Sequence, residues 1–242
     1  AATKLNLSGE DGDTITITGD YFKNAATYGY ANFFSDELAS LRYYDPFLKD
    51  YKDNRYNSFT SAIIQAYDSA AFQKIKKKEG KQVQINYERR VDKYQVIEYD
   101  NLLTGSFERK AIEGKIALLG YINRDPTDIL DKKFTPMNER FAGKSRPDMN
   151  GIVVHANIIS MVLGNNYIKK VPSWVNLLIA VVVCWLFMSF FIRYYLENHI
   201  WFHLVAKIIQ VAAVLLFAYL GIYFYDAYSI KLDMKLSLVV II

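Results

Sequence analysis

The stretch WVNLLIAVVVCWLFMSFFI, residues 174–192, decides the fold of this chain. It is apolar except for Asn176 and Ser189. A helix rises about 1.5 Å per residue, so a helix of this length covers about 30 Å of hydrocarbon. We therefore predict a membrane-spanning helix, with Pro172 ahead of its first turn and Trp174 at the membrane interface.

Two further apolar segments follow this helix. The run over residues 200–225 predicts a second span, in which Lys207 lies near enough to the interface for its long stem to reach the headgroups. The run over residues 236–242 predicts the start of a third span or, alternatively, an interfacial tail. We thus expect a soluble domain over residues 1–171 and transmembrane helices within residues 172–242.

Charge and cysteine content restrict the partners of the soluble part. The 29 Lys and Arg residues are interleaved with 25 Asp and Glu residues, so the net charge of +4 does not predict nucleic-acid binding. The lysine-rich run over residues 74–81 is typical of a solvated helix end. Cys184 is the single cysteine and lies in an apolar run, which excludes a disulfide scaffold. Because the chain starts with Ala and Ile242 falls within an apolar run, we expect a portion of a longer protein.

The soluble part alternates strand-like and helix-like patterns. Apolar residues at helical spacing predict a helix over residues 58–78, capped by Ser58. The run KIALLGY, residues 115–121, predicts a strand buried on both faces, and residues 151–164 predict a helix. Further predictions are strands at residues 14–18 and 83–87 and a helical turn at residues 101–105. The predicted fold class is an α/β domain with a mixed sheet, followed by two to three transmembrane helices.

Several of these segments resemble the type-two CHASE domain, a bacterial extracytoplasmic sensory module. GKIALLG at residues 114–120 resembles a strand of that family, and GIVVHAN at residues 151–157 resembles the start of its helix. The resemblance also includes Asp131 with Thr135 and Pro136, the INY triplet at residues 85–87, and Gly29, Asn32, Asp36 and Arg42 within residues 26–42. It covers about residues 14 to 242, although Val154 stands where the family often has an acidic residue. The resemblance implies a periplasmic domain on the bacterial inner membrane, with its first visible span running to the cytoplasm.

Three residues are candidates for ligand binding: Arg42, Asp131 and His155. Arg42 could receive an anionic ligand or pair with Asp36, and Arg146 offers a similar guanidinium. His155 lacks an accompanying nucleophile motif or a zinc-protease pattern, so we expect a structural histidine that hydrogen-bonds the preceding loop, for instance Asp131, with ligand contact as the alternative. We expect no catalytic residue, no cofactor and no enzyme activity.

A metal site is not expected either. Asp125, Asp128 and Asp131 recur at a spacing of three, but the Gly and Glu of a calcium loop do not accompany them.

Two functions remain open. The first is a sensory receptor that binds a ligand or protein partner and relays the signal through its membrane helices. The alternative is an accessory or scaffolding subunit of a larger envelope complex, which the 19 Tyr and 15 Phe residues favour because aromatic side chains suit interfaces. Expected partners are membrane lipid and other proteins or further copies of the chain, while the small-molecule ligand is not defined by the sequence.

Overall fold

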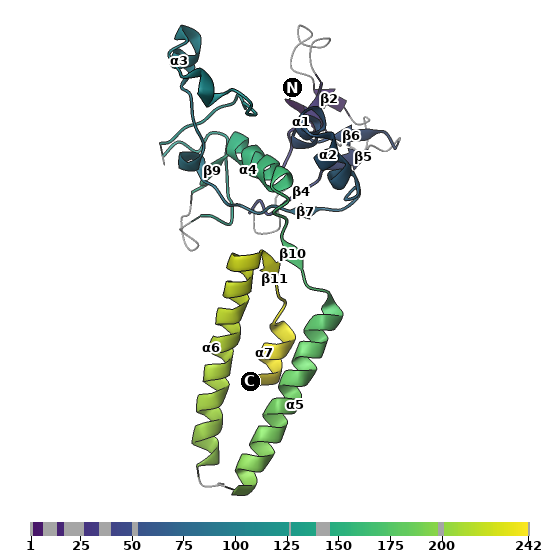
Figure 1. Ribbon diagram of the computed structural model, residues 1–242, viewed down its shortest axis with the longest axis vertical. Helices are drawn as coiled ribbons and strands as arrows, with labels where there is room; N and C mark the ends of the chain where they lie inside the picture. The colour runs from purple at the N-terminus through teal and green to yellow at the C-terminus, as the bar shows by residue number, and fades with distance from the viewer. Residues whose placement is uncertain are drawn as a thin grey trace. The chain divides into compact units, whose positions relative to one another are not determined.

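The computed structural model describes residues 2–6, 14–16, 27–33, 40–49, 53–125, 127–138, 146–197 and 201–241 (Figure 1). Their contacts divide the chain into two compact units, Ala1–Tyr167 and Ile168–Ile242. We call them unit 1 and unit 2.

Unit 1 is a mixed α/β region with small sheets, which confirms the predicted fold class. Its strands are β1 (Ala2–Asn6), β2 (Thr14–Thr16), β3 (Gly29–Tyr30), β4 (Tyr43–Tyr44), β5 (Phe47–Lys49), β6 (Arg55–Asn57), β7 (Val83–Gln84), β8 (Lys132–Lys133) and β9 (Met149–Asn150). Its helices are α1 (Phe59–Tyr67), α2 (Ser69–Lys76), α3 (Tyr99–Thr104) and α4 (Gly151–Leu163).

The largest sheet has the order β2-β1-β3 and is mixed, because β1 is antiparallel to β2 and parallel to β3. The remaining strands of unit 1 form antiparallel pairs: β4 with β7, β5 with β6, and β8 with β9. Strand β2 confirms the first three residues of the strand predicted at 14–18, and residues 17 and 18 lie outside the described residues. The predicted turn at 101–105 is the end of α3, closed by Gly105 at a φ of 71°.

The helix predicted over residues 58–78 is two helices. The Ser58 hydroxyl caps α1 as expected, since it accepts the Ser61 N–H at 3.1 Å. The chain then breaks at Asp68, whose backbone is extended and whose carboxylate accepts the N–H groups of Ala70 and Ala71 at 2.8 and 3.0 Å. An N-cap acid satisfies the free donors of a new first turn. Apolar spacing continues through this break, which is why periodicity alone predicted one helix.

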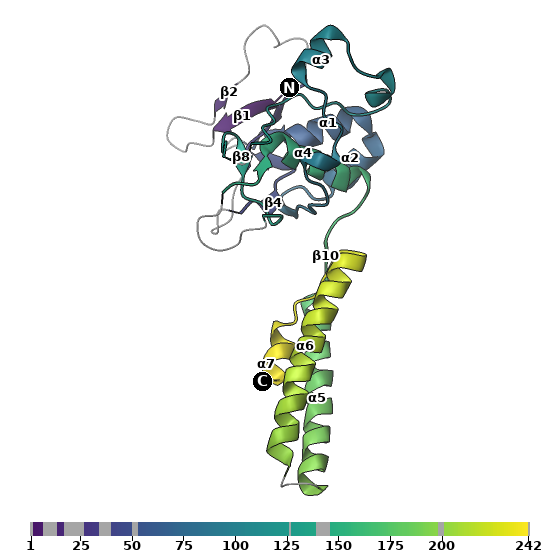
Figure 2. The same cartoon turned by 90° about the vertical axis from the view of Figure 1, so that its left-hand side faces the viewer.

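Helix α4 is central to the core of unit 1. Helices α1 and α2 both pack against it (Figure 2). Its Val154, Ile158 and Met161 are almost fully buried, together with Ile64 of α1 and Ile75 of α2. Full burial of an aliphatic side chain stabilises a fold by about 1.5–3 kcal/mol, so this contact is a main source of stability for unit 1.

The strand predicted at residues 115–121 is not present. The backbone is irregular after Lys115, and Leu119 and Tyr121 are 81% and 46% exposed. Ile116 and Leu118 do pack on the core, so the run covers the core with one face only. A strand needs ladder partners for its N–H and C=O groups, and no described strand of unit 1 pairs with this segment. The continuous apolar run predicts burial on both faces, and this prediction is wrong because Leu119 and Tyr121 are exposed.

Unit 2 consists of helices α5 (Ser173–Glu197), α6 (Phe202–Tyr228) and α7 (Lys235–Ile241) with the short parallel pair β10 (Lys169–Lys170) and β11 (Ile230–Lys231). Helix α7 packs on both α5 and α6 (Figure 1). By length and composition, α5 and α6 could each cross a membrane, and most of their large apolar side chains are exposed. The two predicted spans at 174–192 and 200–225 thus correspond to real helices, and the described part of the third run is the seven-residue helix α7.

Candidate functional site

The first turn of α4 is tied to Asp131. The Gly151 N–H donates to the Asp131 carbonyl at 2.9 Å, next to the β8–β9 ladder in which Lys132 faces Asn150. A Cβ atom at Gly151 would lie 3.1 Å from Asp131 Oδ2, so the missing side chain leaves room for this carboxylate. A carboxylate at this place is favoured by the positive end of the helix dipole.

His155 lies one turn further along α4 and is 6% exposed. Its ring contacts Phe33, with centroids 4.4 Å apart, and Phe59, with centroids 5.1 Å apart at an interplanar angle of 77°. Nδ1 is buried without a hydrogen-bond partner among the described residues. Burial lowers the pKa of His155 to about 4, so the imidazole is neutral at pH 7. A hydrogen bond to the preceding loop was expected; among the described residues, the ring contacts of His155 are with Phe33 and Phe59.

Gly29 determines where the two phenylalanines can sit. A Cβ atom at Gly29 would lie 2.7 Å from both the Ser58 carbonyl oxygen and the Phe59 Cα. Only a residue without a side chain permits this approach, and Tyr30 forms a parallel bridge with Ser58 beside it. The glycine therefore brings residues 29–33 against the start of α1, where Phe59 meets His155.

Asn157 is the most completely hydrogen-bonded side chain on α4 and was missed as a candidate. Its Oδ1 accepts the N–H groups of Glu88 and Arg89 at 3.2 and 3.1 Å. Its Nδ2 donates to the carbonyls of Arg89 and Val153 at 2.8 and 3.0 Å. The HAN triplet at residues 155–157 was the signal available in the sequence. In the structure, the His155 ring packs against two aromatic rings, and Asn157 hydrogen-bonds the backbone of residues 88 and 89. We call this set of bonds from Asn157 the Asn157 clamp.

A polar pair, the buried Thr135 with Asp148, joins the loop after β8 to the residue that precedes β9. The Asp148 carboxylate accepts the Thr135 N–H at 2.8 Å and the Thr135 hydroxyl at 2.5 Å. Burial raises the pKa of Asp148, while the two bonds from Thr135 oppose that rise. Thr135 belonged to the Thr-Pro pair of the family resemblance, and Asp148 was not predicted. The pair fixes the course of the chain into α4.

The segment that contains Arg42 is hydrogen-bonded to the loop that follows β8 and to the residue that follows β7. Its neighbour Leu41 donates to the Phe134 carbonyl at 2.7 Å, and the Arg42 carbonyl accepts the Ile85 N–H at 2.9 Å. The structure therefore brings Asp131 and His155 to the first two turns of α4, whereas the backbone of Arg42 is bound to Ile85. Asp36, the expected partner of Arg42, lies outside the described residues.

Asp125 and Asp128, the other two aspartates that recur at a spacing of three, accept hydrogen bonds from residues of their own loop. Asp125 accepts the Thr127 N–H and hydroxyl, both at 2.8 Å, and the backbone bond is the main cause of its lowered pKa. Asp128 accepts the Leu130 N–H at 2.8 Å and the Tyr121 hydroxyl at 2.7 Å, and its pKa is lowered in the same way. Within the described ranges, no three His, Cys, Asp or Glu side chains are grouped as metal ligands would be.

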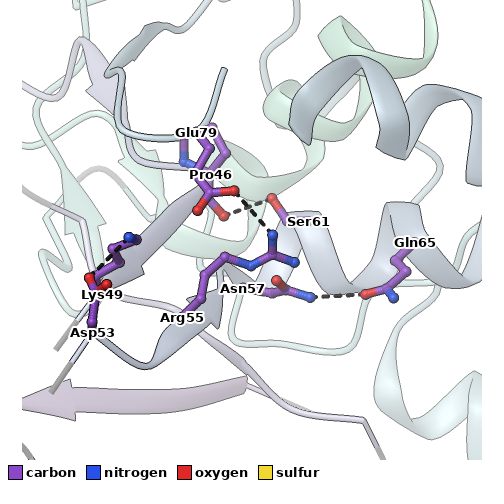
Figure 3. A network of polar contacts seen from close by, with 8 residues as sticks. All are labelled: Pro46, Lys49, Asp53, Arg55, Asn57, Ser61, Gln65 and Glu79. Atoms are coloured by element: carbon purple, nitrogen blue, oxygen red, sulfur yellow. Dashed lines mark hydrogen bonds and ion pairs between the residues drawn. The ribbon is translucent and has the colours of Figure 1, made fainter. Parts of the chain in front are cut away.

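A separate polar network ties the β5–β6 hairpin to α1 and to the end of α2 (Figure 3). The Ser61 hydroxyl donates to the Pro46 carbonyl at 2.9 Å, and Asn57 donates to Gln65 at 2.9 Å. Arg55 pairs with Glu79 at 3.1 Å. Exposed pairs of this kind contribute at most about 1 kcal/mol each, so we assign the network a positioning role.

Comparison with known protein families matches residues 4–191 to the CHASE2 domain. The matched region starts in β1 and continues through α4 into the first long apolar helix, α5. Neither the curated proteins nor the solved structures contain a match to this chain.

Proposed function

This chain belongs to the CHASE2 domain family, and we propose that it is a receptor of the bacterial inner membrane whose periplasmic domain binds a ligand or protein partner and relays binding through α5. It carries an extracellular sensory domain followed by two helices long and apolar enough to cross a membrane. Ligand binding, relay of that binding through α5 and location in the inner membrane are all proposals.

The proposal rests on the connection between α4 and α5 along the chain. Helix α4 holds buried polar side chains in unit 1, and it is the last helix before α5. A ligand that favours one arrangement of α4 therefore acts on the last helix before the first span. Moving a population from 1:99 to 99:1 requires about 5.5 kcal/mol of differential binding between two arrangements.

The buried histidine and asparagine of α4 suit such a switch better than they suit catalysis. Among the described residues, His155 contacts Phe33 and Phe59 and no acid or nucleophile, and we propose that the chain has no enzyme activity of its own. Nδ1 of His155 and Nδ2 of Asn150 are both buried without a hydrogen-bond partner among the described residues. Unpaired buried polar atoms cost about 1–3 kcal/mol each, and a ligand that satisfied either atom would recover that free energy.

Membrane topology provides the direct test of localisation. We would replace Cys184 by Ser, introduce Lys110→Cys in the exposed loop of unit 1, and treat intact bacterial cells with a membrane-impermeant maleimide. The proposal expects immediate labelling of Lys110→Cys. The matched variant Arg193→Cys, at the other end of α5, should be labelled only after lysis. The reverse pattern would place the sensory domain in the cytoplasm and contradict the proposal.

Ligand binding is tested on the full chain in detergent by thermal shift. A ligand that binds the folded state at 100 times its Kd stabilises it by about 2.7 kcal/mol. We expect the stabilisation by any binder found to weaken in Asn157→Ala, because that change loosens α4. If the ligand-induced thermal shift were unchanged in this variant, ligand binding would not depend on α4, and the proposed relay through α4 would be contradicted.

A second candidate function is an accessory subunit that docks other envelope proteins. It is supported by large apolar side chains that lie exposed on residues 99–130 of unit 1: Tyr99, Leu102, Leu103, Ile112, Leu119, Tyr121, Ile129 and Leu130. Exposed apolar patches commonly mark interaction sites. Affinity purification from mild detergent should then recover partners that Leu119→Lys loses and Lys110→Gln keeps. Recovery of the chain alone would argue against this function.

A further inference from the structure

Five lysines gather where α2 ends: Lys74, Lys76, Lys77, Lys78 and Lys81, which we call the lysine cluster. Lys74, Lys77 and Lys78 share one side of the helix end by their spacing of three and four residues. Backbone turns continue past the helix, with Lys78 N–H donating to the Ile75 carbonyl at 2.7 Å and Lys81 N–H donating to the Lys78 carbonyl at 3.1 Å. The cluster is therefore a compact surface and not an extended tail.

Among the described residues of unit 1, few acids accompany the positive charge of this surface. Glu79 is the one acid among residues 74–81, and Arg55 already binds it at 3.1 Å. Among the described residues, no carboxylate forms an ion pair with Lys74, Lys76, Lys77 or Lys81, all of which are exposed. The surface that these side chains present is strongly cationic.

Favourable interaction with the helix dipole does not account for so many lysines. The dipole acts within the last turn, and one or two cations there obtain its benefit. Like charges three or four residues apart repel one another, as Lys74 does with Lys77 and Lys78. An anionic surface outside the chain would relieve that repulsion.

The cluster is also anchored close to the point where the chain leaves unit 1. Lys78 Nζ lies 4.0 Å from the ring centroid of Tyr167, the last residue of unit 1. Residues 168–172 alone separate Tyr167 from Ser173, where α5 begins. A link of this length spans at most about 20 Å even when fully extended. The chain itself therefore keeps Tyr167, against which Lys78 lies, within about 20 Å of the residue at which α5 begins.

From these observations we propose that the lysine cluster binds the phosphate headgroups of anionic phospholipids in the membrane that holds α5. A lysine near an anionic lipid surface contributes about a fivefold increase in binding, so several together make a substantial attachment. The interaction would hold one face of unit 1 against the headgroup layer. It does not depend on the receptor role proposed above.

The test uses the full chain in nanodiscs of phosphatidylcholine, with and without phosphatidylglycerol, and measures lysine acylation by an impermeant amine-reactive ester with peptide mass spectrometry. Phosphate groups favour the charged ammonium form, which is not nucleophilic. We expect cluster lysines to react about fivefold more slowly in discs that contain phosphatidylglycerol. Lys93 and Lys110, exposed elsewhere on unit 1, should react equally in both discs. At about 1 M salt, where the Debye length is about 3 Å, the difference should disappear.

Equal acylation rates for the cluster in both discs would overturn the proposal. Two further arms separate other anions from lipid. Protection by inorganic phosphate in phosphatidylcholine discs, to the same extent, would assign the cluster to a free anion and overturn the lipid assignment. Protection by polyglutamate but not by phosphatidylglycerol would assign it to an acidic protein partner and also overturn it.

A variant gives an independent measurement. Combined Lys74→Gln, Lys76→Gln, Lys77→Gln and Lys81→Gln should retain at least about fivefold less phosphatidylglycerol after purification, because each of the lost charges weakens binding about fivefold. The corresponding four-arginine variant should retain it, as should Lys93→Gln with Lys110→Gln. Amide exchange in α4 checks that the glutamine variant is folded. Undiminished lipid retention by a folded glutamine variant would overturn the proposal.

Discussion

Helices α4 and α5 are both rich in apolar residues, yet they are covered in different ways. Most residues of the 13-residue α4 are buried inside unit 1, including the polar His155 and Asn157. The 25-residue α5 leaves large side chains such as Trp174, Leu177 and Trp185 exposed. Apolar composition alone therefore does not define a helix's environment. Length and available covering surface distinguish a core helix from one long and apolar enough to cross a membrane.

The comparison also explains where polar side chains are tolerated. In α4 the protein supplies the hydrogen-bond partners of Asn157, which accepts two bonds and donates two within unit 1. A helix of the length of α5 can instead lie in lipid, where its backbone bonds are satisfied within the helix itself. Substitutions at matched positions in the two helices should therefore have different effects.

The largest difference is expected for truncation of an aliphatic side chain. Ile158 in α4 is 0% exposed, so Ile158→Ala should lower the free energy of unfolding of unit 1 by about 4 kcal/mol through lost burial and a cavity. Leu177→Ala in α5 should leave unit 1 unchanged, because Leu177 is exposed and belongs to unit 2. Amide exchange of α4 in the full chain, in detergent, measures both. Equal effects of the two substitutions would contradict this comparison.

A slightly smaller effect is expected from pH, through His155. The folded-state pKa of about 4 lies below the ordinary value of 6.5, so the unfolded chain takes up the proton first as the pH falls. The contribution to stability is complete above pH 6.5, decreases between pH 6.5 and 4, and is lost below pH 4. The total loss is about 3 kcal/mol.

The control variant for this pH dependence is His155→Phe, which keeps an aromatic ring beside Phe33 and Phe59. It should flatten the stability profile between pH 6.5 and 4, as measured by urea unfolding of the full chain in detergent. His203→Phe in α6 should preserve the profile of unit 1. A slope that persists in His155→Phe would show that another group is responsible.

Much of this architecture could be predicted from local patterns. The lengths of the apolar runs predicted α5 and α6, the Ser58 cap predicted the start of α1, and the GIVVHAN stretch predicted α4. These features are encoded by residues close together in the chain. The family membership followed from such stretches as well.

Other features could not be predicted because they depend on distant residues. Asn157 bonds with Glu88 and Arg89, and His155 packs between rings at residues 33 and 59. Nothing in the spacing of the HAN triplet shows which segments it will contact. The same limit applies to KIALLGY, since an apolar run becomes a strand only when another segment pairs with it.

The third prediction concerns the Asn157 clamp. Asn157→Ala leaves the N–H groups of Glu88 and Arg89 without their acceptor and should lower the free energy of unfolding by about 2 kcal/mol. Exchange of those two amides should accelerate first. Asn176→Ala in α5 is the matched control in unit 2 and should leave both amides unchanged. Slow exchange at residues 88 and 89 in Asn157→Ala would contradict the clamp.

The smallest effect is expected at the first turn of α4. Gly151→Ala places a Cβ atom 3.1 Å from Asp131 Oδ2 and should cost about 1 kcal/mol, although alanine favours a helix by a similar amount over glycine elsewhere. Gly221→Ala in α6 meets Met234 Sδ only at 3.6 Å, an ordinary contact, and should be neutral or stabilising. The change in the free energy of unfolding should therefore have opposite signs at these two glycines. This result would show that adding a single methyl group destabilises the protein-covered helix but not the exposed one.

The cause of the Gly151→Ala effect can be isolated with a second substitution. Asp131 has a φ of 53°, a left-handed conformation that glycine adopts freely, so Asp131→Gly removes the carboxylate without straining the backbone. In that background Gly151→Ala should change from destabilising to stabilising, as measured by urea unfolding of the four members of the double-mutant cycle. If Gly151→Ala remained destabilising without the carboxylate, contact with Asp131 would not be the reason that glycine occupies this position.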